Sequence, residues 1–318
     1  MKLWFDTDPG VDDALALALI ARSPAFELVG LSTVFGNADV RTTTANALGL
    51  CALLGLDVPV HAGAAGPLHG SPRLAPEVHG GDGLGGHAAS LPAPRRQAER
   101  LPAPEAIVRA ARVEPDLHLA AVGPFTNLAQ ALRLDPDLPQ RLASVTLMGG
   151  AFGLHGQSGN VTPNAEANVF NDTRAADEVF AAPWRRLHVV GLDATQRVRI
   201  PRAALAALAD GDAVAQLLHR AAMPYIDFYH RHYGQEVLVA HDAIALMPLL
   251  APTTLQWRQG PVRVVEGGLA HGQTTQDWQR LGGADWRDLP EHAVAVDANA
   301  PAITELCLRA WLNQGERT

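Results

Sequence analysis

Lysine is nearly absent from this chain of 318 residues. Lys2 is the only one, which excludes a Schiff-base lysine and the lysine of a phosphate-binding P-loop. Only two cysteines occur, Cys51 and Cys307, and both lie in apolar helical patterns, so buried structural roles are expected rather than disulfides. No uncharged apolar run approaches the about 18 residues that cross a bilayer. Asp6 and Asp8 interrupt the place where a secretory signal would lie, so we expect a cytoplasmic protein with no membrane partner.

The charge balance of the chain is acidic. The 25 Lys and Arg residues stand against 33 Asp and Glu, a formal net charge of −8, which argues against a nucleic acid as the main partner. Hydrophobic residues make up 47% of the chain, enough to bury a large core and to exclude a disordered or fibrous protein. No convincing linker divides the chain, so we expect a single domain over residues 1–318.

Short apolar runs alternate with helical patterns along the first two-thirds of the chain. Strands are predicted at residues 3–5, 27–34, 117–122, 144–148 and 187–190. Helices are predicted at 12–22, 41–54, 212–232, 240–250 and 302–313, with a β-like region at 255–296. This pattern indicates an α/β fold with an open, largely parallel (mixed) sheet and helices on both faces. Such a sheet places its ligands at the carboxyl ends of its strands.

The most informative segment lies directly after the first predicted strand. Four carboxylates, those of Asp6, Asp8, Asp12 and Asp13, occur within eight residues. Acids favour helix N-termini, which accounts for Asp12 and Asp13 but not for the other two. Two charges about 5 Å apart repel by about 3 kcal/mol at an effective dielectric constant of about 20, so a converging cluster needs a cation or protons. Oxygen ligands select Ca²⁺ or Mg²⁺, and a solvated acidic turn is the alternative.

Two known uses of such acids fit poorly. An EF-hand loop beginning at Asp6 would place Gly10 and Leu17 where it needs an oxygen ligand and a glutamate. The segment also resembles the haloacid-dehalogenase-like phosphotransferases, in which Asp6 would be the nucleophile. Gly10 departs from that pattern and no downstream lysine is available. A Mg²⁺-dependent phosphohydrolase with Asp6 as nucleophile therefore stays as an alternative.

A third known arrangement of such acids matches the sequence along most of the chain. Residues 6–14, Asp-Thr-Asp-Pro-Gly-Val-Asp-Asp-Ala, resemble the N-terminal motif of the inosine–uridine-preferring nucleoside hydrolases, a family of Ca²⁺-dependent N-ribohydrolases. Further blocks follow in the family's order, at residues 35–37, 79–85, 123–129, 148–150, 160–168 and 241–242. The resemblance implies hydrolysis of the N-glycosidic bond of ribonucleosides and the fold of that family. A non-catalytic nucleoside-binding protein is the remaining alternative.

The resemblance also implies a metal site and a catalytic base. The carboxylates of Asp8, Asp13 and Asp242 and the main-chain oxygen of Thr126 are expected to bind Ca²⁺. Asp8 is then the general base that activates a water on the ion, and this water attacks the glycosidic bond.

The substrate contacts come from the same blocks. We expect Asp12, Asn37 and Asn168 near the ribose diol or around the ligands of the metal. Asn160 and Glu166 are expected at the 5′-hydroxyl group. Met148 is expected to line the same pocket.

The leaving base needs a hydrogen-bond or proton donor. His241, which directly precedes Asp242, is the candidate, although the chain has 13 histidines and most have other roles. Tyr225 and Tyr229 lie one helical turn apart and either border the nucleobase or simply pack. His79 is a further candidate contact for the base.

One position departs from the family's pattern. Ala167 stands between Glu166 and Asn168, where the family commonly has an aromatic residue, so the preferred nucleobase is left open. The resemblance further suggests a homotetramer or homodimer.

Overall fold

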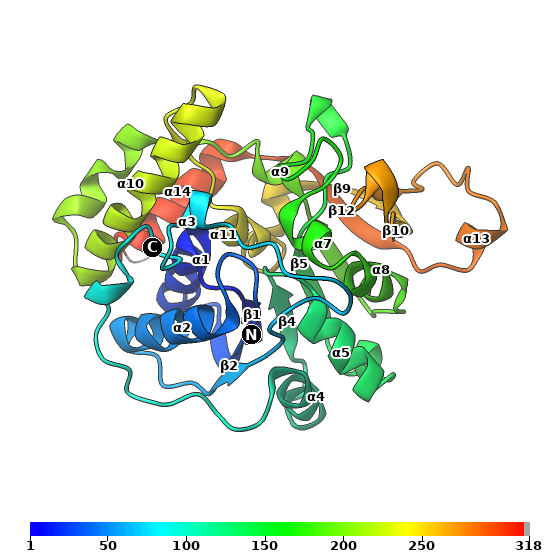
Figure 1. Cartoon of the computed structure of the whole chain (residues 1–318), viewed down its shortest axis with the longest axis horizontal. Helices are drawn as coiled ribbons and strands as arrows, with labels where there is room; N and C mark the ends of the chain where they lie inside the picture. The colour runs from blue at the N-terminus through cyan, green and yellow to red at the C-terminus, as the bar shows by residue number, and fades with distance from the viewer. Residues whose placement is uncertain (315–318) are drawn as a thin grey trace.

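The computed structural model describes residues 1–314 of the chain. Its centre is an eight-stranded sheet with the strand order β3-β2-β1-β4-β5-β6-β12-β9 (Figure 1). These strands are β1 (Lys2–Thr7), β2 (Glu27–Thr33), β3 (Val60–Ala62), β4 (His118–Ala121), β5 (Ser144–Met148), β6 (Leu187–Val190), β9 (Leu255–Gly260) and β12 (His292–Ala298). Every pairing is parallel except that of β9 with β12. The predicted largely parallel, mixed sheet is confirmed.

Helices cover both faces of this sheet. On one face α1 (Val11–Arg22) lies beneath α10 (Ala213–Tyr233) and α14 (Ala300–Trp311), beside α2 (Val40–Leu54). Because α1 is covered all round, its Ala and Leu residues are buried on nearly every side. On the other face α4 (Ala103–Val113), α5 (Thr126–Leu134) and α8 (Thr173–Ala181) form a second core. Adjacent residues of β1 enter the two cores in turn, as Leu3 and Trp4 do.

The remaining elements are short. They are β7 (Ile200–Pro201), β8 (Val237–Leu238), β10 (Val262–Val264), β11 (Thr274–Gln276), α3 (Pro76–His79), α6 (Leu138–Arg141), α7 (Ala167–Asn171), α9 (Leu192–Thr195), α11 (His241–Ala245), α12 (Met247–Leu250) and α13 (Ala284–Arg287). Five 3₁₀ turns complete the set, at Ala88–Ser90, Leu154–Gly156, Arg202–Asp210, Pro252–Thr254 and Gly268–Ala270. In Figure 1 the segment around β10 and α13 projects from one side of the body.

Two predicted elements differ from the structure. The single helix expected at 240–250 is wrong, because α11 ends before Leu246 and α12 begins at Met247. Pro248 has no N–H to donate to Ile244 of an unbroken helix. The last helix begins two residues earlier than expected, where Asn299 accepts a hydrogen bond from the N–H of Ala302 (3.3 Å) and Pro301 occupies the first turn.

The strand order fixes where a ligand can bind. The chain crosses from β1 to α1 on one face, and from β4 to α5 on the other, although β1 and β4 are neighbours. A crevice opens at such a reversal, beyond the carboxyl ends of the two strands. Asp8 follows β1, and Val122 follows β4.

None of the helices within residues 1–314 has the length and apolar composition that a bilayer crossing requires. Both cysteines are free and buried, as expected. The single domain over residues 1–318 stays a prediction, and its last four residues lie outside the described part.

Candidate active site

A cavity of about 310 Å³ lies at the carboxyl edge of the sheet. Twelve of the fourteen predicted site residues line it: Asp8, Asp12, Asn37, His79, Met148, Asn160, Glu166, Asn168, Tyr225, Tyr229, His241 and Asp242. The other two, Asp13 and Thr126, are buried outside its lining. The hydroxyl group of Thr126 donates to Asp172 (2.7 Å), so the side chain is directed at Asp172.

Carboxylates from the two ends of the chain meet at this cavity. Oxygens of Asp12, Asp13 and Asp242 lie within 4.8 Å of one another, and all three side chains are buried. Burial, and then the repulsion of neighbouring carboxylates, raises the pKa of Asp8 and of Asp12 well above the usual value, and Asp242 shares this shift. Asp12 Oδ1 is buried and has no hydrogen-bond partner among the described residues. An all-oxygen, strongly anionic donor set with an unpartnered oxygen fits a hard divalent cation.

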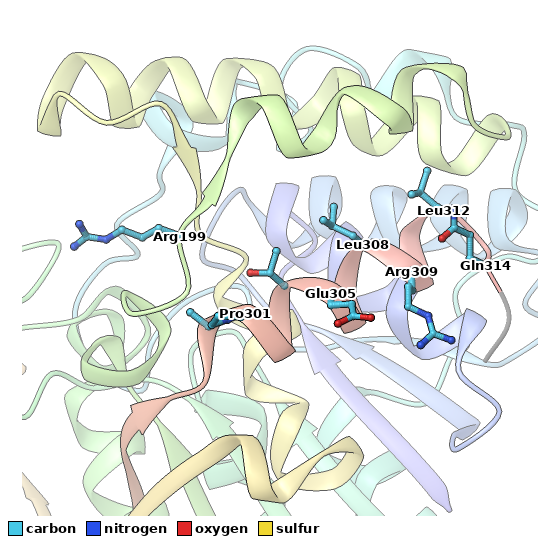
Figure 2. Close-up of a pocket in the computed structure, with 9 residues that line it drawn as sticks. Arg199, Pro301, Glu305, Leu308, Arg309, Leu312 and Gln314 are labelled. Atoms are coloured by element: carbon cyan, nitrogen blue, oxygen red, sulfur yellow. The ribbon is translucent and has the colours of Figure 1, made fainter. Parts of the chain in front are cut away.

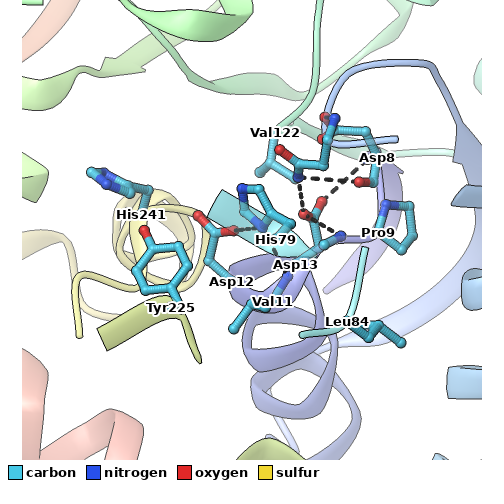
Figure 3. A network of polar contacts seen from close by, with 12 residues as sticks. Asp8, Pro9, Val11, Asp12, Asp13, His79, Leu84, Val122, Tyr225 and His241 are labelled. Carbon is cyan, nitrogen blue, oxygen red and sulfur yellow. Dashed lines mark hydrogen bonds and ion pairs between the residues drawn. The ribbon is translucent and has the colours of Figure 1, made fainter. Parts of the chain in front are cut away.

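Asp13 shapes the turn that carries the cluster. Its carboxylate accepts hydrogen bonds from the hydroxyl group of Thr7, the N–H of Asp8 (3.1 Å), the N–H of Gly10 (2.8 Å) and the side-chain amide of Asn37 (2.8 Å). Figure 3 shows Asp13 at the start of α1, with Asp8 beside it. The donors come from the end of β1, from the residues that precede α1 and from the loop after β2, so Asp13 holds the turn between β1 and α1.

The carboxylate of Asp8 fits closely between the backbones of two glycines. Its Oδ2 accepts the backbone N–H of Asn37 at 2.8 Å. A Cβ atom at Gly36 would lie 2.0 Å from Oδ2, and one at Gly123 would lie 2.7 Å from Oδ1. Only glycine, which has no side chain, leaves room for this carboxylate at both positions. Both glycines lie in the sequence motifs, but the motifs alone do not show why glycine is needed there.

Glu166 and two asparagines join the loops at another part of the cavity. Glu166 accepts three backbone N–H groups, from Asn168 (2.8 Å), Gly150 (3.0 Å) and Val169 (3.1 Å), so it caps α7 while burial raises its pKa. The amide of Asn168 donates to the carbonyl oxygens of Val122 (2.7 Å) and Met148 (3.0 Å). Asn160 Oδ1 accepts the N–H of Ala167 at 3.0 Å, which leaves its own N–H groups for a ligand.

His241 lies in an aromatic and hydroxylic environment. Its Nε2 is 3.0 Å from the hydroxyl oxygen of Tyr229, and its Nδ1 is 2.7 Å from Oγ1 of Thr195. The Tyr225 ring stacks on Tyr229 with 5.1 Å between centroids, and its hydroxyl group donates to the carbonyl oxygen of Val239 (3.1 Å). Tyr225 and Tyr229 therefore pack against each other and also line the cavity. Burial lowers the pKa of His241 to about 4, so the ring is neutral near pH 7.

His79 is also neutral. Its Nδ1 accepts the N–H of Val11 at 3.2 Å, so this nitrogen carries no proton. Asp12 Oδ1 is 3.8 Å away from the same nitrogen, and the contact is therefore not an ion pair. Burial lowers the pKa of His79 to about 3, and its ring meets Tyr225 edge-on at 5.7 Å.

Asp6 does not reach the cavity. It is fully buried, and its Oδ1 accepts from the hydroxyl group of Ser32 and the amide of Asn127 (2.8 Å). Burial raises the pKa of this carboxyl to about 6. A side chain closed off in this way does not meet a substrate, which removes the support for Asp6 as a nucleophile.

Several lining residues lie outside the predicted set. They include residues of the loop before α3, of α3 itself and of the last turns of α10, namely Arg73, Glu77, Phe228, His232 and Tyr233. Thr195, behind His241, was missed as well. The spacing of Tyr225, Tyr229 and Tyr233 was the available signal for the α10 side, because these three lie four residues apart and are the only tyrosines in the chain.

A second hollow runs along α14, with a volume of about 490 Å³. Figure 2 shows Glu305, Leu308 and Arg309 on that helix and Leu312 just after it, with Arg199 across from them. Its described lining offers one carboxylate and no histidine. The chemistry of the side chains therefore selects the carboxylate-lined cavity as the candidate active site.

Comparison with known proteins agrees with this geometry. Residues 3–305 match a family model described as inosine-uridine preferring nucleoside hydrolase. A probable uridine nucleosidase 2 of Arabidopsis thaliana is 34% identical over 96% of each chain. A pyrimidine-specific ribonucleoside hydrolase, RihB, of Escherichia coli O157:H7 is 33% identical over 87% of each chain.

Solved structures resemble the whole fold. A plant nucleoside hydrolase superposes with a TM-score of 0.92 at 31% identity, covering 98% of both chains. A purine-preferring ribonucleoside hydrolase from Gardnerella vaginalis superposes with a TM-score of 0.89 at 28% identity and the same coverage.

Proposed function

This chain belongs to the inosine-uridine preferring nucleoside hydrolase family, whose members are ribonucleoside N-ribohydrolases, and we propose that it hydrolyses ribonucleosides with Asp8 as general base and Ca²⁺ as cofactor. The observation that supports this most is the meeting of Asp8, Asp12 and Asp242 in one cavity that also contains His241. The names of the relatives include both pyrimidine- and purine-directed enzymes, so uridine and inosine are both substrates to test.

The proposed metal ligands are the carboxylates of Asp8, Asp13 and Asp242 and the main-chain oxygen of Thr126. An ion held by oxygen atoms alone fits Ca²⁺, which takes 6–8 such ligands. The bound ion would neutralise the carboxylates, bind sugar hydroxyl groups and lower the pKa of water beside it. The unpartnered Oδ1 of Asp12 is the natural acceptor for a ribose hydroxyl group in the same place.

Asp8 takes the proton from the attacking water. Its position between Gly36 and Gly123 keeps the carboxylate from rotating away. The bond between C1′ and the base nitrogen breaks as positive charge develops on the sugar, and the nearby carboxylates stabilise that charge.

The sugar is held from both ends in this proposal. Asp12, Asn37 and Asn168 bind the 2′- and 3′-hydroxyl groups, while Asn160 and Glu166 bind the 5′-hydroxyl group beside Met148. These contacts are remote from the bond that breaks, and their binding energy orients C1′ against the water.

The leaving base meets His241, Tyr225, Tyr229 and His79. Since His241 is neutral at pH 7, it assists as a hydrogen-bond donor to the departing base rather than as a charged imidazolium. The aromatic rings along α10 provide a flat, apolar surface for the base.

The test is a product assay. The protein is incubated with CaCl₂ and uridine, inosine or uridine 5′-monophosphate, and the free base, ribose and phosphate are measured. The proposal expects base and ribose in equal amounts from the nucleosides. Inorganic phosphate from the nucleotide would support the phosphohydrolase, and binding without turnover would support a nucleoside-binding protein.

Two further expectations accompany this function. Assembly into a homotetramer or homodimer stays a prediction, which sedimentation of the purified protein checks. A cytoplasmic location likewise stays a prediction.

A further inference from the structure

Thr195 touches His241 from the side opposite the cavity. It ends α9, the short helix after β6, and its side chain is fully buried. Oγ1 lies 2.7 Å from Nδ1 of His241, whereas Tyr229, on the other ring nitrogen, lines the cavity. Nδ1 therefore faces the protein interior, and Nε2 faces the side where a substrate binds.

The burial of Thr195 favours one tautomer of the neutral ring, because only Tyr229 borders the cavity. Among residues 1–314, the hydroxyl group of Thr195 has no hydrogen-bond partner other than His241. If Nδ1 carried the hydrogen, it would donate to Oγ1, and the Thr195 hydroxyl hydrogen would be buried without an acceptor, which is unfavourable. If Thr195 donates to Nδ1 instead, the ring hydrogen stands on Nε2 and has the Tyr229 oxygen as its acceptor, 3.0 Å away. The hydroxyl hydrogen of Tyr229 then points into the cavity that Tyr229 lines, where water or substrate accepts it.

A neighbouring side chain acts on the same pair. The amide of Gln196, which directly follows α9, donates to the hydroxyl oxygen of Tyr229 at 3.4 Å. Thr195 and Gln196, at the end of α9, thus contact the two side chains in turn: Thr195 contacts His241, and Gln196 contacts Tyr229. His241 lies on α11, beside Asp242, and its ring is oriented from α9.

We propose that Thr195 is a positioning residue that keeps the hydrogen of His241 on Nε2, where it stabilises the departing nucleobase. The proposal rests on the proposed function, since it assigns a partner to the group that assists the leaving base. When the C1′–N bond breaks, the electron pair goes to the base. The Nε2–H group then donates its hydrogen bond to the negative charge that develops there, in place of the Tyr229 oxygen. No proton passes through Thr195.

The test compares two substrates and two substitutions. Thr195→Val keeps the shape and removes the hydroxyl group, and Thr195→Ser keeps the hydroxyl group. With uridine, Thr195→Val is expected to lower kcat about fivefold to tenfold with little change in KM, because one buried hydrogen bond is lost. With 4-nitrophenyl riboside, whose leaving group needs no assistance, kcat should change less than about twofold, and Thr195→Ser should restore the uridine rate. The ratio of the two rates does not depend on how much of the variant is folded.

Equal losses on both substrates, no loss on uridine, or no rescue by serine would each overturn the proposal. Thr195→Ala removes the same hydroxyl group and replaces the valine variant if that one does not fold. The ¹⁵N chemical shifts of the His241 ring give a readout without turnover. They should report Nε2–H in the wild type, and a wild type with Nδ1–H would contradict the proposal even if the protein hydrolysed no nucleoside. Failure of the proposed function alone would instead appear as a wild type that turns over neither substrate.

Discussion

The backbone N–H of Asn37 donates to Oδ2 of Asp8 at 2.8 Å, so the residue that follows β2 orients the carboxylate that follows β1. The side chain of Asn37 donates to Asp13 in addition, which links the proposed base to the turn that carries the acidic cluster. The orientation of Asp8 is thus built into the scaffold before any ligand binds. An active site in which the base is fixed in advance predicts sharp losses from small changes.

Replacing Asp8 by asparagine should abolish turnover. The substitution keeps the shape in the space between Gly36 and Gly123 but removes the basic oxygen, so kcat on uridine should fall by about 10³-fold, within the usual range for a general base. Release of free uracil measures it. Asp6→Asn is the matched control, because Asp6 lies two residues away and outside the cavity, and it should lose less than about tenfold. A near wild-type rate for Asp8→Asn would refute the assignment of the base.

Calcium should stabilise the protein more at pH 8 than at pH 5.5. The raised pKa values of Asp8, Asp12 and Asp242 mean that, above about pH 4, the folded state binds more protons than the unfolded state. Without metal, these groups therefore destabilise the fold as the pH rises. The cation takes the place of those protons. At a calcium concentration of about 100 times the Kd, binding adds about 2.7 kcal/mol to the free energy of unfolding, or roughly 5 °C to Tm.

The measurement is Tm with CaCl₂ and with EDTA at each pH. The lowered pKa values of the buried histidines His79 and His241 destabilise the fold on acidification, with or without calcium. Comparing Tm with CaCl₂ and Tm with EDTA at the same pH cancels this effect. Asp242→Asn should remove the calcium shift at pH 8. The same shift at both pH values would argue against binding at these carboxylates.

Asn160 should matter only for substrates that carry a 5′-hydroxyl group. Asn160→Ala should raise KM or lower kcat for uridine, together about tenfold in kcat/KM, because the N–H groups left free by its bond to Ala167 lose their ligand. With 5′-deoxyuridine the wild type and the variant should differ by less than about twofold. Similar losses on both nucleosides would mean that Asn160 acts by supporting the loop instead.

His241→Ala should slow natural nucleosides more than activated ones. Uridine hydrolysis should fall about 10²-fold, since the base leaves without its hydrogen-bond donor, while hydrolysis of 4-nitrophenyl riboside should stay within about threefold of the wild type. Steady-state kinetics on both substrates provide the comparison. A uniform loss would show that the histidine supports the structure near Asp242 rather than the leaving group.

Much of the site could be predicted because its residues come from the ends of strands. Asp8, Asn37 and Met148 lie at or just after the ends of β1, β2 and β5, and parallel strands bring those ends to one edge. Ordered motifs located the others. The fold class followed from strands that are buried on both faces and therefore read as continuous apolar runs, as in β5.

Other features depend on contacts that no local pattern records. Thr195 lies 46 residues before His241 and in no motif, and only the approach of α9 to α11 brings their side chains together. Asp6 shares a motif with Asp8 but bonds to Ser32 and Asn127, which are far along the chain. The break at Leu246 is set by a proline whose effect on the helix depends on its exact position.

The most direct test of the account is a crystal structure of the protein grown with calcium. The account predicts one ion per chain, bound by Asp8, Asp13 and Asp242 and by the main-chain oxygen of Thr126, with Asp12 beside it. A map with no ion among these carboxylates, or with Asp242 turned away from Asp8 and Asp13, would contradict it.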